Sequence, residues 1–247
     1  EDGDVEKAMK KAKKHIEAIY EVPYLAHATM EPMNCTAHVL KDYCELWAPT
    51  QNPQGAQRKA MQLTGFSKDK VKVHVTQLGC GLGRRSSSDF IQDSVEIAMN
   101  VDVPVKLIWT REEDMQHDFY RPASMSRFQI GLNKDGFPIS WNNQLASPSI
   151  LKRFFAPMAW FNIDPLSTEG ADEIPYAIED FNFDYSVVDS GVPVGFWRSV
   201  GSSFNAFFTE SAIDEAAHLA QQDQFDYRMK LLSGKPRFQK VLEKVMI

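Results

Sequence analysis

The sequence predicts an α+β protein in which layered mixed or antiparallel sheets pack against helices. Two observations support this class: segments with strand and helix periodicity alternate irregularly, and a strong turn at 133–136 joins two strand-like segments. The 247 residues are 43% hydrophobic and 24% charged, which suffices for a sizeable core without disulfide bonds. The irregular order favours this class over a regular βαβ series.

Local periodicity and helix-ending residues set the expected elements. Strand patterns occur at 15–22, 42–47, 71–75, 105–110, 127–132, from residue 139 onward, and at 185–188. Helix patterns occur at 4–14, 53–63, 87–99, 204–219 and 225–232. Asn52 or Thr50 is a candidate N-cap of the second helix, Gly65 ends it, and Ser202 or Ser203 is a candidate cap of the fourth. The proline-containing stretch 146–180 is long for a structureless loop, so we expect it to be functional or partly helical.

Charge, apolar runs and cysteine spacing argue against several classes of protein. A net charge of −6, without an interleaved basic and aromatic stripe, disfavours nucleic-acid binding. No run of 18 apolar residues occurs, so we expect no transmembrane segment. Cys35, Cys44 and Cys80 contain no C-x-x-C spacing, which disfavours a zinc site, a complete iron–sulfur cluster and a disulfide framework, and leaves open a single Cys35–Cys44 bond. The chain begins at Glu1 rather than Met, so we expect a processed chain or a fragment.

The most informative segment is the glycine-rich loop 77–85. Its three glycines follow a predicted strand and precede a predicted helix. Glycine lets a backbone approach a ligand closely, and the N–H groups of a helix start attract anions, to which Arg84 and Arg85 would add charge. We interpret the loop as a cradle for a phosphate-bearing cofactor. The alternative is a tight turn that merely requires glycines.

A nicotinamide-binding fingerprint is a second interpretation of the same loop. In the pattern G-x-G-x-x-G, Arg84 stands where the third glycine belongs, and Gly83 falls one residue early. Asp102 does lie at the separation expected of a ribose-binding carboxylate. The misplaced glycine makes this interpretation the weaker one.

Two further segments carry unusual polar residues. In 191–201, Arg198 beside Trp197 could bind an anion or stack on a planar ring, or it could pair with a carboxylate such as Asp189. In 23–34, His27 and Glu31 are four residues apart, but H-E-x-x-H is absent. We therefore expect His27 to be a buried, hydrogen-bonded residue rather than a metal ligand, and Glu31 to anchor a loop through backbone N–H groups.

Taken together and in this order, these segments resemble the large subunit of molybdenum hydroxylases of the xanthine dehydrogenase/aldehyde oxidase family, particularly the branch of the isoquinoline 1-oxidoreductase beta subunit. The blocks that carry the resemblance are 26–37, 47–54, 77–85, 109–115 with 121–123, and 195–201 with 210–215. The resemblance implies that residues 1–247 form a partial molybdopterin-binding region, the first half of the molybdenum-binding part of a larger subunit. The implied fold is the molybdopterin-binding domain of this family.

The resemblance also implies a cofactor site. The glycine loop would supply backbone N–H groups beneath a molybdopterin, and the arginine loop would lie near the metal. The sequence departs from the family pattern at Cys80, where a glycine is usual, and at Leu82, where an aromatic residue is usual, which leaves the shape of the substrate pocket open. The residues implied to bind the cofactor are Gly79, Cys80, Gly81, Leu82, Gly83, Arg84, Trp197, Arg198 and Ser199.

The implied activity is hydroxylation of an N-heterocycle or aldehyde with water as the oxygen source. Purine-oxidising relatives place a glutamine at the position of Leu25, which cannot donate that hydrogen bond, so a purine substrate is disfavoured. No metal ligand or catalytic residue is expected in the chain. The general-base glutamate of the family is expected beyond Ile247, because Glu210 and Glu215 suit packing and surface roles.

The resemblance implies several partners as well. The molybdopterin would be a cytosine dinucleotide form, and electrons would pass to a small subunit carrying [2Fe–2S] clusters. The rest of the large subunit and a small-molecule substrate complete the set. Two alternatives stay open: a module that holds a cofactor without turnover, and a nicotinamide-dependent dehydrogenase.

Overall fold

The computed structural model describes residues 2–154 and 164–245, which divide into two compact units. The chain passes twice from the first unit to the second and back. The first unit contains residues 1–24, 122–191 and 199–247, and the second contains 25–121 and 192–198. Within the described part of the chain, no helix is both long and apolar enough to cross a membrane.

The first unit is built on a four-stranded mixed sheet in the order β1-β6-β7-β8. Strands β1 (Lys14–Val22), β6 (Ser124–Leu132) and β7 (Pro138–Ser147) pair antiparallel, whereas β8 (Asp180–Val187) runs parallel to β7. The predicted turn after β6 is present: the Asn133 side chain accepts a hydrogen bond from the backbone N–H of Asp135. This confirms the expected hairpin.

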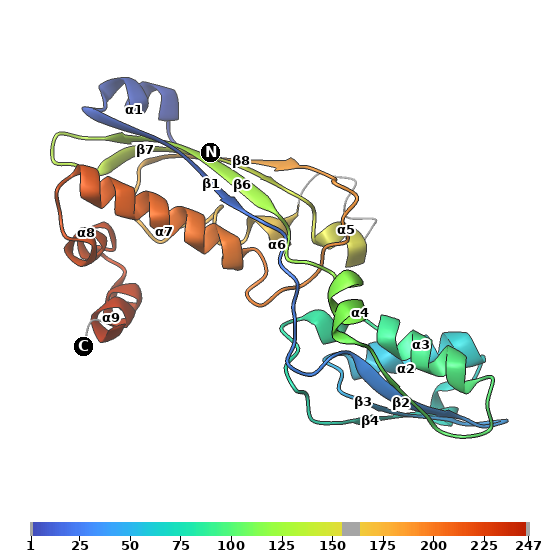
Figure 1. Cartoon of the computed structure of the whole chain (residues 1–247). Helices are drawn as coiled ribbons and strands as arrows, with labels where there is room; N and C mark the ends of the chain where they lie inside the picture. The colour runs from blue at the N-terminus through green and yellow to red at the C-terminus, as the bar shows by residue number, and fades with distance from the viewer. Residues whose placement is uncertain (1, 155–163, 246–247) are drawn as a thin grey trace. The chain divides into compact units, whose positions relative to one another are not determined.

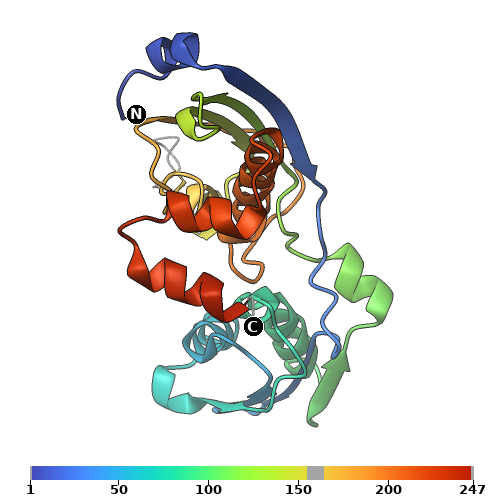
Figure 2. The same ribbon diagram turned by 90° about the vertical axis from the view of Figure 1, so that its left-hand side faces the viewer.

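Helices cover both faces of this sheet (Figures 1 and 2). Helix α1 (Val5–Lys11) lies over one face, and the long helix α7 (Ser202–Leu219) lies along the other. Helices α8 (Gln224–Leu231) and α9 (Pro236–Val245) follow α7. The core between α7 and the sheet is aromatic, with Trp141, Phe128, Phe204 and Phe208 buried in one cluster.

The second unit has a four-stranded sheet in the order β4-β3-β2-β5. Strands β2 (Asn34–Val39), β3 (Cys44–Ala48) and β5 (Val105–Ile108) pair antiparallel through β2, and β4 (Val71–Val75) runs parallel to β3. Residues of β2 and β3 alternate between buried and half-buried, as expected for strands with one covered face.

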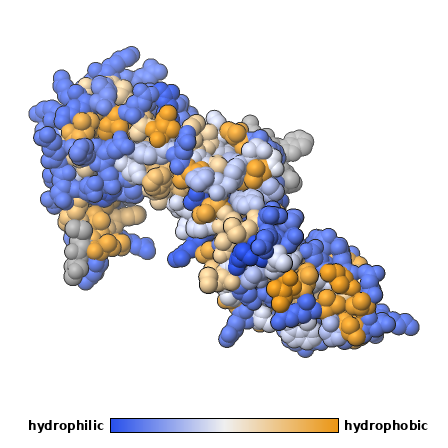
Figure 3. Space-filling model, viewed as in Figure 1, coloured by the Kyte–Doolittle hydropathy of each residue, from blue (hydrophilic) through white to orange (hydrophobic). Residues whose placement is uncertain are grey.

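Helices α2 (Pro53–Thr64) and α3 (Asp89–Ala98) pack on that covered face. The core contains mainly small and medium side chains, such as those of Cys35 and Leu46, together with the larger Phe90. A short helix α4 (Arg111–Gln116) follows β5. Figure 3 shows apolar side chains gathered on the viewed face of this unit; the exposed apolar residues of α3, β5 and the intervening turn include Ile97, Met99, Val101, Val103 and Ile108.

Several local predictions are confirmed, and others are wrong. Asn52 caps α2 through its side chain, and Gly65 ends that helix with φ of 74°. Helix α7 is capped by Gly201 without a side-chain hydrogen bond, so the prediction of a serine cap is wrong. All three cysteines are free thiols, which rules out the Cys35–Cys44 bond.

The 146–180 stretch is partly helical, as expected. It contains the single-turn helices α5 (Leu151–Phe154) and α6 (Pro165–Thr168). Its central portion, 155–163, which includes Pro157, lies outside the described residues. Among the strands and α-helices, the sequence patterns did not predict β2, α4 and α9.

Candidate cofactor site

The glycine-rich loop leaves β4 and enters a 3-10 turn at Arg84–Ser86 before α3 begins. Three residues of the loop have positive φ: Cys80 at 84°, Leu82 at 52° and Gly83 at 105°. Residues with side chains rarely adopt this conformation, which costs on the order of 1–3 kcal/mol each. The loop is therefore held in a shape that its own residues do not prefer, and the surrounding structure must impose that shape.

Two side chains from other segments hold the loop. Glu31 Oε2 accepts a hydrogen bond from the N–H of Gly79 at 2.8 Å, and the N–H of Glu31 donates to Gly79 O at 3.0 Å. Gln51 Oε1 accepts from the N–H of Gly83 at 3.1 Å. A Cβ on Gly79 would approach the Cβ of Glu31 to 2.5 Å, and a Cβ on Gly81 would collide with the Gln51 side chain. The prediction that Glu31 anchors a loop through backbone N–H groups is confirmed, and Gln51 is a second anchor that sequence reasoning missed.

The middle of the loop presents backbone donors. The N–H groups of Cys80, Gly81 and Leu82 have no hydrogen-bond partner among residues 2–154 and 164–245. Successive unpaired N–H groups in such a turn form a concavity that attracts an anion or an acceptor-rich ligand. Of the loop positions that were expected to bind a cofactor, these three keep a free backbone donor.

Arg84 is enclosed rather than exposed. It is 1% accessible, its guanidinium donates to Asp89 at 2.9 and 2.6 Å, and its Nε lies 3.0 Å from Asp118 Oδ1 in a close ionic contact without hydrogen-bond alignment. The rings of Trp109 and Phe119 lie 5.4 and 4.8 Å from its guanidinium carbon. The Arg84 side chain therefore stabilises the protein around the loop.

Arg85 holds the loop through hydrogen bonds from its guanidinium group. It is fully buried and donates to Cys80 O at 2.8 Å, to Glu31 O at 2.7 Å and to Glu31 Oε2 at 3.0 Å. Burial lowers the pKa of Arg85, and the nearby Glu31 carboxylate opposes that shift. The expectation that Arg84 and Arg85 present free charge to an anion is wrong, because both guanidinium groups are already paired inside the protein.

The 192–198 segment lies against the glycine loop in the same unit. The Phe196 carbonyl oxygen occupies the place where a side chain on Gly83 would stand, so the two backbones touch. The N–H of Gly195 donates to Tyr120 O at 3.1 Å, and the N–H of Tyr120 donates to Pro193 O at 3.0 Å. The structure thus brings together the two segments that the sequence singled out separately.

The arginine of this segment, Arg198, has no carboxylate partner within the described part of the chain. Arg198 is exposed. Asp189, the partner suggested from sequence, instead binds Lys152 at 2.7 Å. Trp197 has a buried indole N–H that lacks a partner among the described residues. Ser199, the next residue, is exposed and has φ of 70°.

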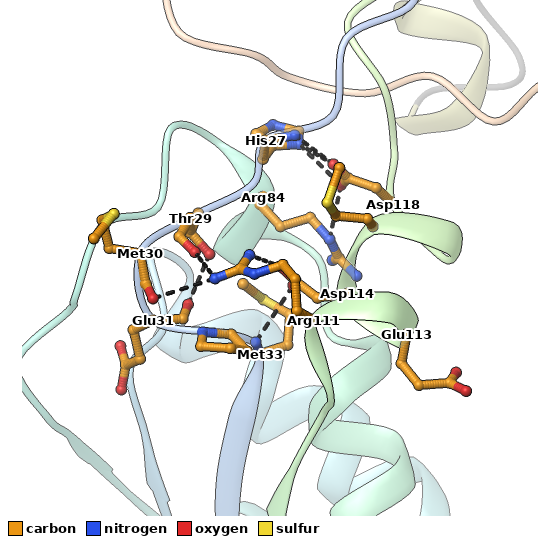
Figure 4. Close-up of polar contacts among 12 residues, drawn as sticks. His27, Thr29, Met30, Glu31, Met33, Arg84, Arg111, Glu113, Asp114 and Asp118 are labelled. Atoms are coloured by element: carbon orange, nitrogen blue, oxygen red, sulfur yellow. Dashed lines mark hydrogen bonds and ion pairs between the residues drawn. The ribbon is translucent and has the colours of Figure 1, made fainter.

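His27 belongs to a buried polar cluster and lies at the top of the view in Figure 4, where its ring faces Asp118. Its side chain is 1% accessible, and its Nδ1 lies 2.9 Å from Asp118 Oδ1. Its Nε2 lies 2.7 Å from Phe196 O. The prediction of a buried, hydrogen-bonded histidine is confirmed. No group of three or more potential metal ligands occurs among the residues that the structure describes.

The topology around the glycine loop does not fit a dinucleotide-binding unit. In such a unit the helix after the loop leads to a strand parallel to the first. Here α3 leads to β5, which pairs antiparallel with β2 at the edge of the sheet opposite β4. Asp102 lies exposed in the turn after α3. The nicotinamide interpretation is therefore not supported.

The two glutamates of α7 have structural partners in the first unit. Glu210 accepts from Tyr176 Oη at 2.8 and 2.9 Å and from Arg228 Nε at 2.9 Å. Glu215 accepts from Tyr20 Oη at 2.5 Å. Burial, followed by the neighbouring carboxylate, raises the pKa of Tyr176. These contacts agree with the packing and surface roles expected of both glutamates.

Comparison with known families identifies the class of protein. A molybdopterin cofactor-binding domain model matches residues 1–232, so the chain belongs to this family. The mixed α+β fold with mixed sheets is the fold expected of it.

Individual relatives agree with this assignment. The chain is 29% identical over 214 residues to the beta subunit of isoquinoline 1-oxidoreductase from Brevundimonas diminuta, a match covering 85% of this chain and 27% of the relative. It is 27% identical over 239 residues to one subunit of nicotinate dehydrogenase from Pseudomonas putida, covering 94% of this chain and 20% of the relative. The chain therefore spans only about a quarter of the length of these relatives.

Solved structures show the same fold. Aldehyde oxidoreductase from Desulfovibrio gigas superposes with a TM-score of 0.77 at 19% identity, covering 93% of this chain and 25% of that chain. Quinoline 2-oxidoreductase from Pseudomonas putida 86 superposes with a TM-score of 0.75 at 15% identity, covering 91% of this chain and 29% of that chain.

Proposed function

We propose that this chain is the first half of the molybdenum-binding part of a hydroxylase large subunit. The complete protein would hydroxylate an N-heterocycle or an aldehyde, with water as the oxygen source. The observation that carries the proposal is the placement, within one unit, of three unpaired backbone N–H groups at Cys80, Gly81 and Leu82 beside the 192–198 segment. Membership of the molybdopterin cofactor-binding family supports it.

The residues present fit a molybdopterin. Its pterin, phosphate and oxygen substituents are rich in acceptors, which the N–H groups of residues 80–82 can bind. Arg198 offers an exposed guanidinium with no ion pair in the described residues, and it suits an anionic group. Trp197 offers a buried indole N–H without a partner in that same part of the chain. Gly79, Gly83 and Arg84 would act by holding the loop, and Ser199 would extend the arginine loop.

When bound, the cofactor supplies a metal that activates water and a centre that accepts two electrons. The overall change converts a C–H bond and water into C–OH, two protons and two electrons. This chain's part in that change would be to bind and orient: residues 80–82 and 197–198 would hold the cofactor, while Glu31, Gln51 and Arg85 keep the loop in its strained shape. The proton acceptor would be a glutamate outside residues 1–247.

The electrons require an acceptor. We propose a small partner subunit with [2Fe–2S] clusters, and a cytosine dinucleotide form of the molybdopterin. The isoquinoline and nicotinate relatives are each named as one subunit of an enzyme, which supports a multisubunit assembly.

The substrate class follows from relatives and from one side chain. The named relatives act on isoquinoline and nicotinate, both N-heterocycles, and the two compared structures are an aldehyde oxidoreductase and a quinoline 2-oxidoreductase. Leu25 has a 39% exposed apolar side chain, and its backbone N–H and carbonyl pair with Arg121. It supplies no side-chain hydrogen bond, which disfavours a purine.

The test is the metal and pterin content of the complete protein purified with its partner. We expect molybdenum by mass spectrometry and an oxidised pterin product by fluorescence, each near one per large subunit. Arg198→Gln should lower both, whereas Arg237→Gln, which changes an exposed arginine of α9, should not. An active, molybdenum-free protein that binds a nicotinamide would contradict the proposal. A loaded protein without turnover would favour a cofactor-holding module.

A further inference from the structure

The two ring nitrogens of His27 both face hydrogen-bond acceptors. Nδ1 lies 2.9 and 3.0 Å from the two carboxylate oxygens of Asp118, and Nε2 lies 2.7 Å from the carbonyl oxygen of Phe196. A carbonyl oxygen never donates, so Nε2 must carry a proton to bond with Phe196. A neutral imidazole has only one N–H, which would leave Nδ1 bare against the carboxylate.

A protonated Asp118 could in principle donate to a bare Nδ1, but its other contacts exclude this. The carboxylate accepts from the backbone N–H of His27 at 2.5 Å and from the backbone N–H of Phe119 at 2.7 Å. It also lies 3.0 Å from Arg84 Nε. Burial raises the pKa of Asp118, whereas its hydrogen bonds, including those from the backbone N–H groups of His27 and Phe119, lower it, and the net shift is downward. Asp118 is therefore the ionised acceptor in this cluster.

We propose that His27 carries a proton on both ring nitrogens and is therefore positively charged. It is a positioning residue that fixes the Phe196 carbonyl against Gly83. We call the Asp118–His27–Phe196 arrangement the clasp. One side of the ring is tied to Asp118, and the other side is tied to Phe196. Because Phe196 O also touches the glycine loop, the clasp sets the separation between that loop and the Trp197–Arg198 pair. The consequence for cofactor binding rests on the function proposed above, whereas the protonation of His27 does not.

The charge of the clasp is balanced locally. Asp118 contributes one negative charge, and Arg84 contributes a positive charge that Asp89 offsets. Asp114, from α4, also lies in this region, where burial raises its pKa and Arg111 opposes that shift. Buried charges cost free energy unless they are paired and hydrogen-bonded, and every charge in this cluster has such a partner.

Neutron diffraction from crystals of the complete protein tests the protonation directly. Both Nδ1 and Nε2 of His27 should carry a deuteron, and Asp118 should carry none. A bare ring nitrogen, or a deuteron on Asp118, would overturn the proposal. This measurement needs no variant and does not depend on whether molybdenum is bound.

Hydrogen exchange of the complete protein, followed by mass spectrometry, tests the positioning role. In His27→Gln, both N–H donors sit on a single nitrogen and cannot span the two acceptors as the two ring nitrogens do, so the 192–198 peptide should loosen. We expect the Gly195 amide, which bonds to Tyr120 O, to exchange at least about tenfold faster than in the parent protein. His38→Gln, a half-buried histidine of β2, should leave this rate unchanged. Equal exchange in the parent protein and His27→Gln would reject the clasp.

The two proposals can fail separately. A doubly protonated His27 and faster exchange in His27→Gln, found in a protein without molybdenum, would keep the clasp and refute the cofactor. Molybdenum in the parent protein together with a bare His27 nitrogen would support the cofactor and refute the clasp. If both hold, His27→Gln should also retain less molybdenum than His38→Gln.

Discussion

The carbonyl oxygen of Phe196 fills the place where a Cβ on Gly83 would stand. Gly83 has φ of 105°, so its backbone conformation and its surroundings both require glycine. This backbone-to-backbone contact joins the glycine loop to the segment that carries Trp197 and Arg198. The two halves of the proposed cofactor cradle therefore belong to one folded unit.

Gly83→Ala should destabilise the second unit strongly. The left-handed conformation alone costs about 1–2 kcal/mol for a residue with a Cβ, and the collision with a backbone oxygen adds to this cost. We expect a loss of more than about 2 kcal/mol in denaturant unfolding. Gly65→Ala is the matched control, because Gly65 has φ of 74° but nothing lies within 4 Å of the added Cβ. Equal losses in the two variants would show that the Phe196 contact is unimportant.

Removing the Asn52 side chain should weaken both α2 and the end of the glycine loop. Its Oδ1 accepts from the Gly55 N–H at 2.9 Å, and its Nδ2 donates to Ser86 O at 3.4 Å. Loss of an N-cap typically costs about 1 kcal/mol, and we expect Asn52→Ala to lose about that amount. Gln54→Ala, at an exposed position of the same helix, should change the unfolding free energy by less than about 0.5 kcal/mol. A similar loss in both would argue against the cap.

The three thiols should differ in reactivity. Burial raises the pKa of Cys35 to about 12 and that of Cys44 to about 11, and both side chains are fully buried. Near pH 8 neither forms much thiolate, whereas Cys80 is partly accessible in the glycine loop. Alkylation of the native protein, mapped by peptide mass spectrometry, should therefore label Cys80 first. Rapid labelling of Cys35 in the native state would contradict this packing.

The buried Asp118 carboxylate should make stability depend on acid pH. Its pKa is lowered on folding, so the ionised form stabilises the folded state. This contribution is complete above the unfolded carboxyl pKa of about 4, and it is lost as the pH falls through the lower folded value. Asp118→Asn should unfold more easily at neutral pH and should lose less stability between about pH 5 and pH 2. Parallel pH profiles for the variant and the parent protein would refute this role.

Much of the fold follows from local patterns. The strand at 71–75, the helix bounded by Asn52 and Gly65, and the hairpin at 133–136 carry periodicity or turn chemistry that acts within a few residues. Strand β2 was missed because it contains polar and apolar residues without a strong apolar run. Its identity depends on pairing with β3, across a short connection, and with β5, which is distant in sequence.

The site was predictable only in part. Glycine spacing pointed to the loop, and the aromatic arginine segment was unusual by composition. Nothing local indicated that Arg84 and Arg85 are buried, because their partners Asp118 and Glu31 come from other segments. Asp118 carried no sequence signal of its own. A charge beside a glycine loop is equally consistent with ligand binding and with internal pairing, and only the fold distinguishes them.

The backbone N–H groups of residues 80–82 are proposed to hold a molybdopterin. A crystal structure of the complete protein, purified with its cofactor, tests this claim most directly. We predict that the N–H groups of Cys80, Gly81 and Leu82 lie within about 3.2 Å of acceptor atoms of the cofactor, with Arg198 at the same site. A cofactor bound elsewhere, or these three N–H groups bonded to the protein's own carbonyl oxygens, would contradict the claim.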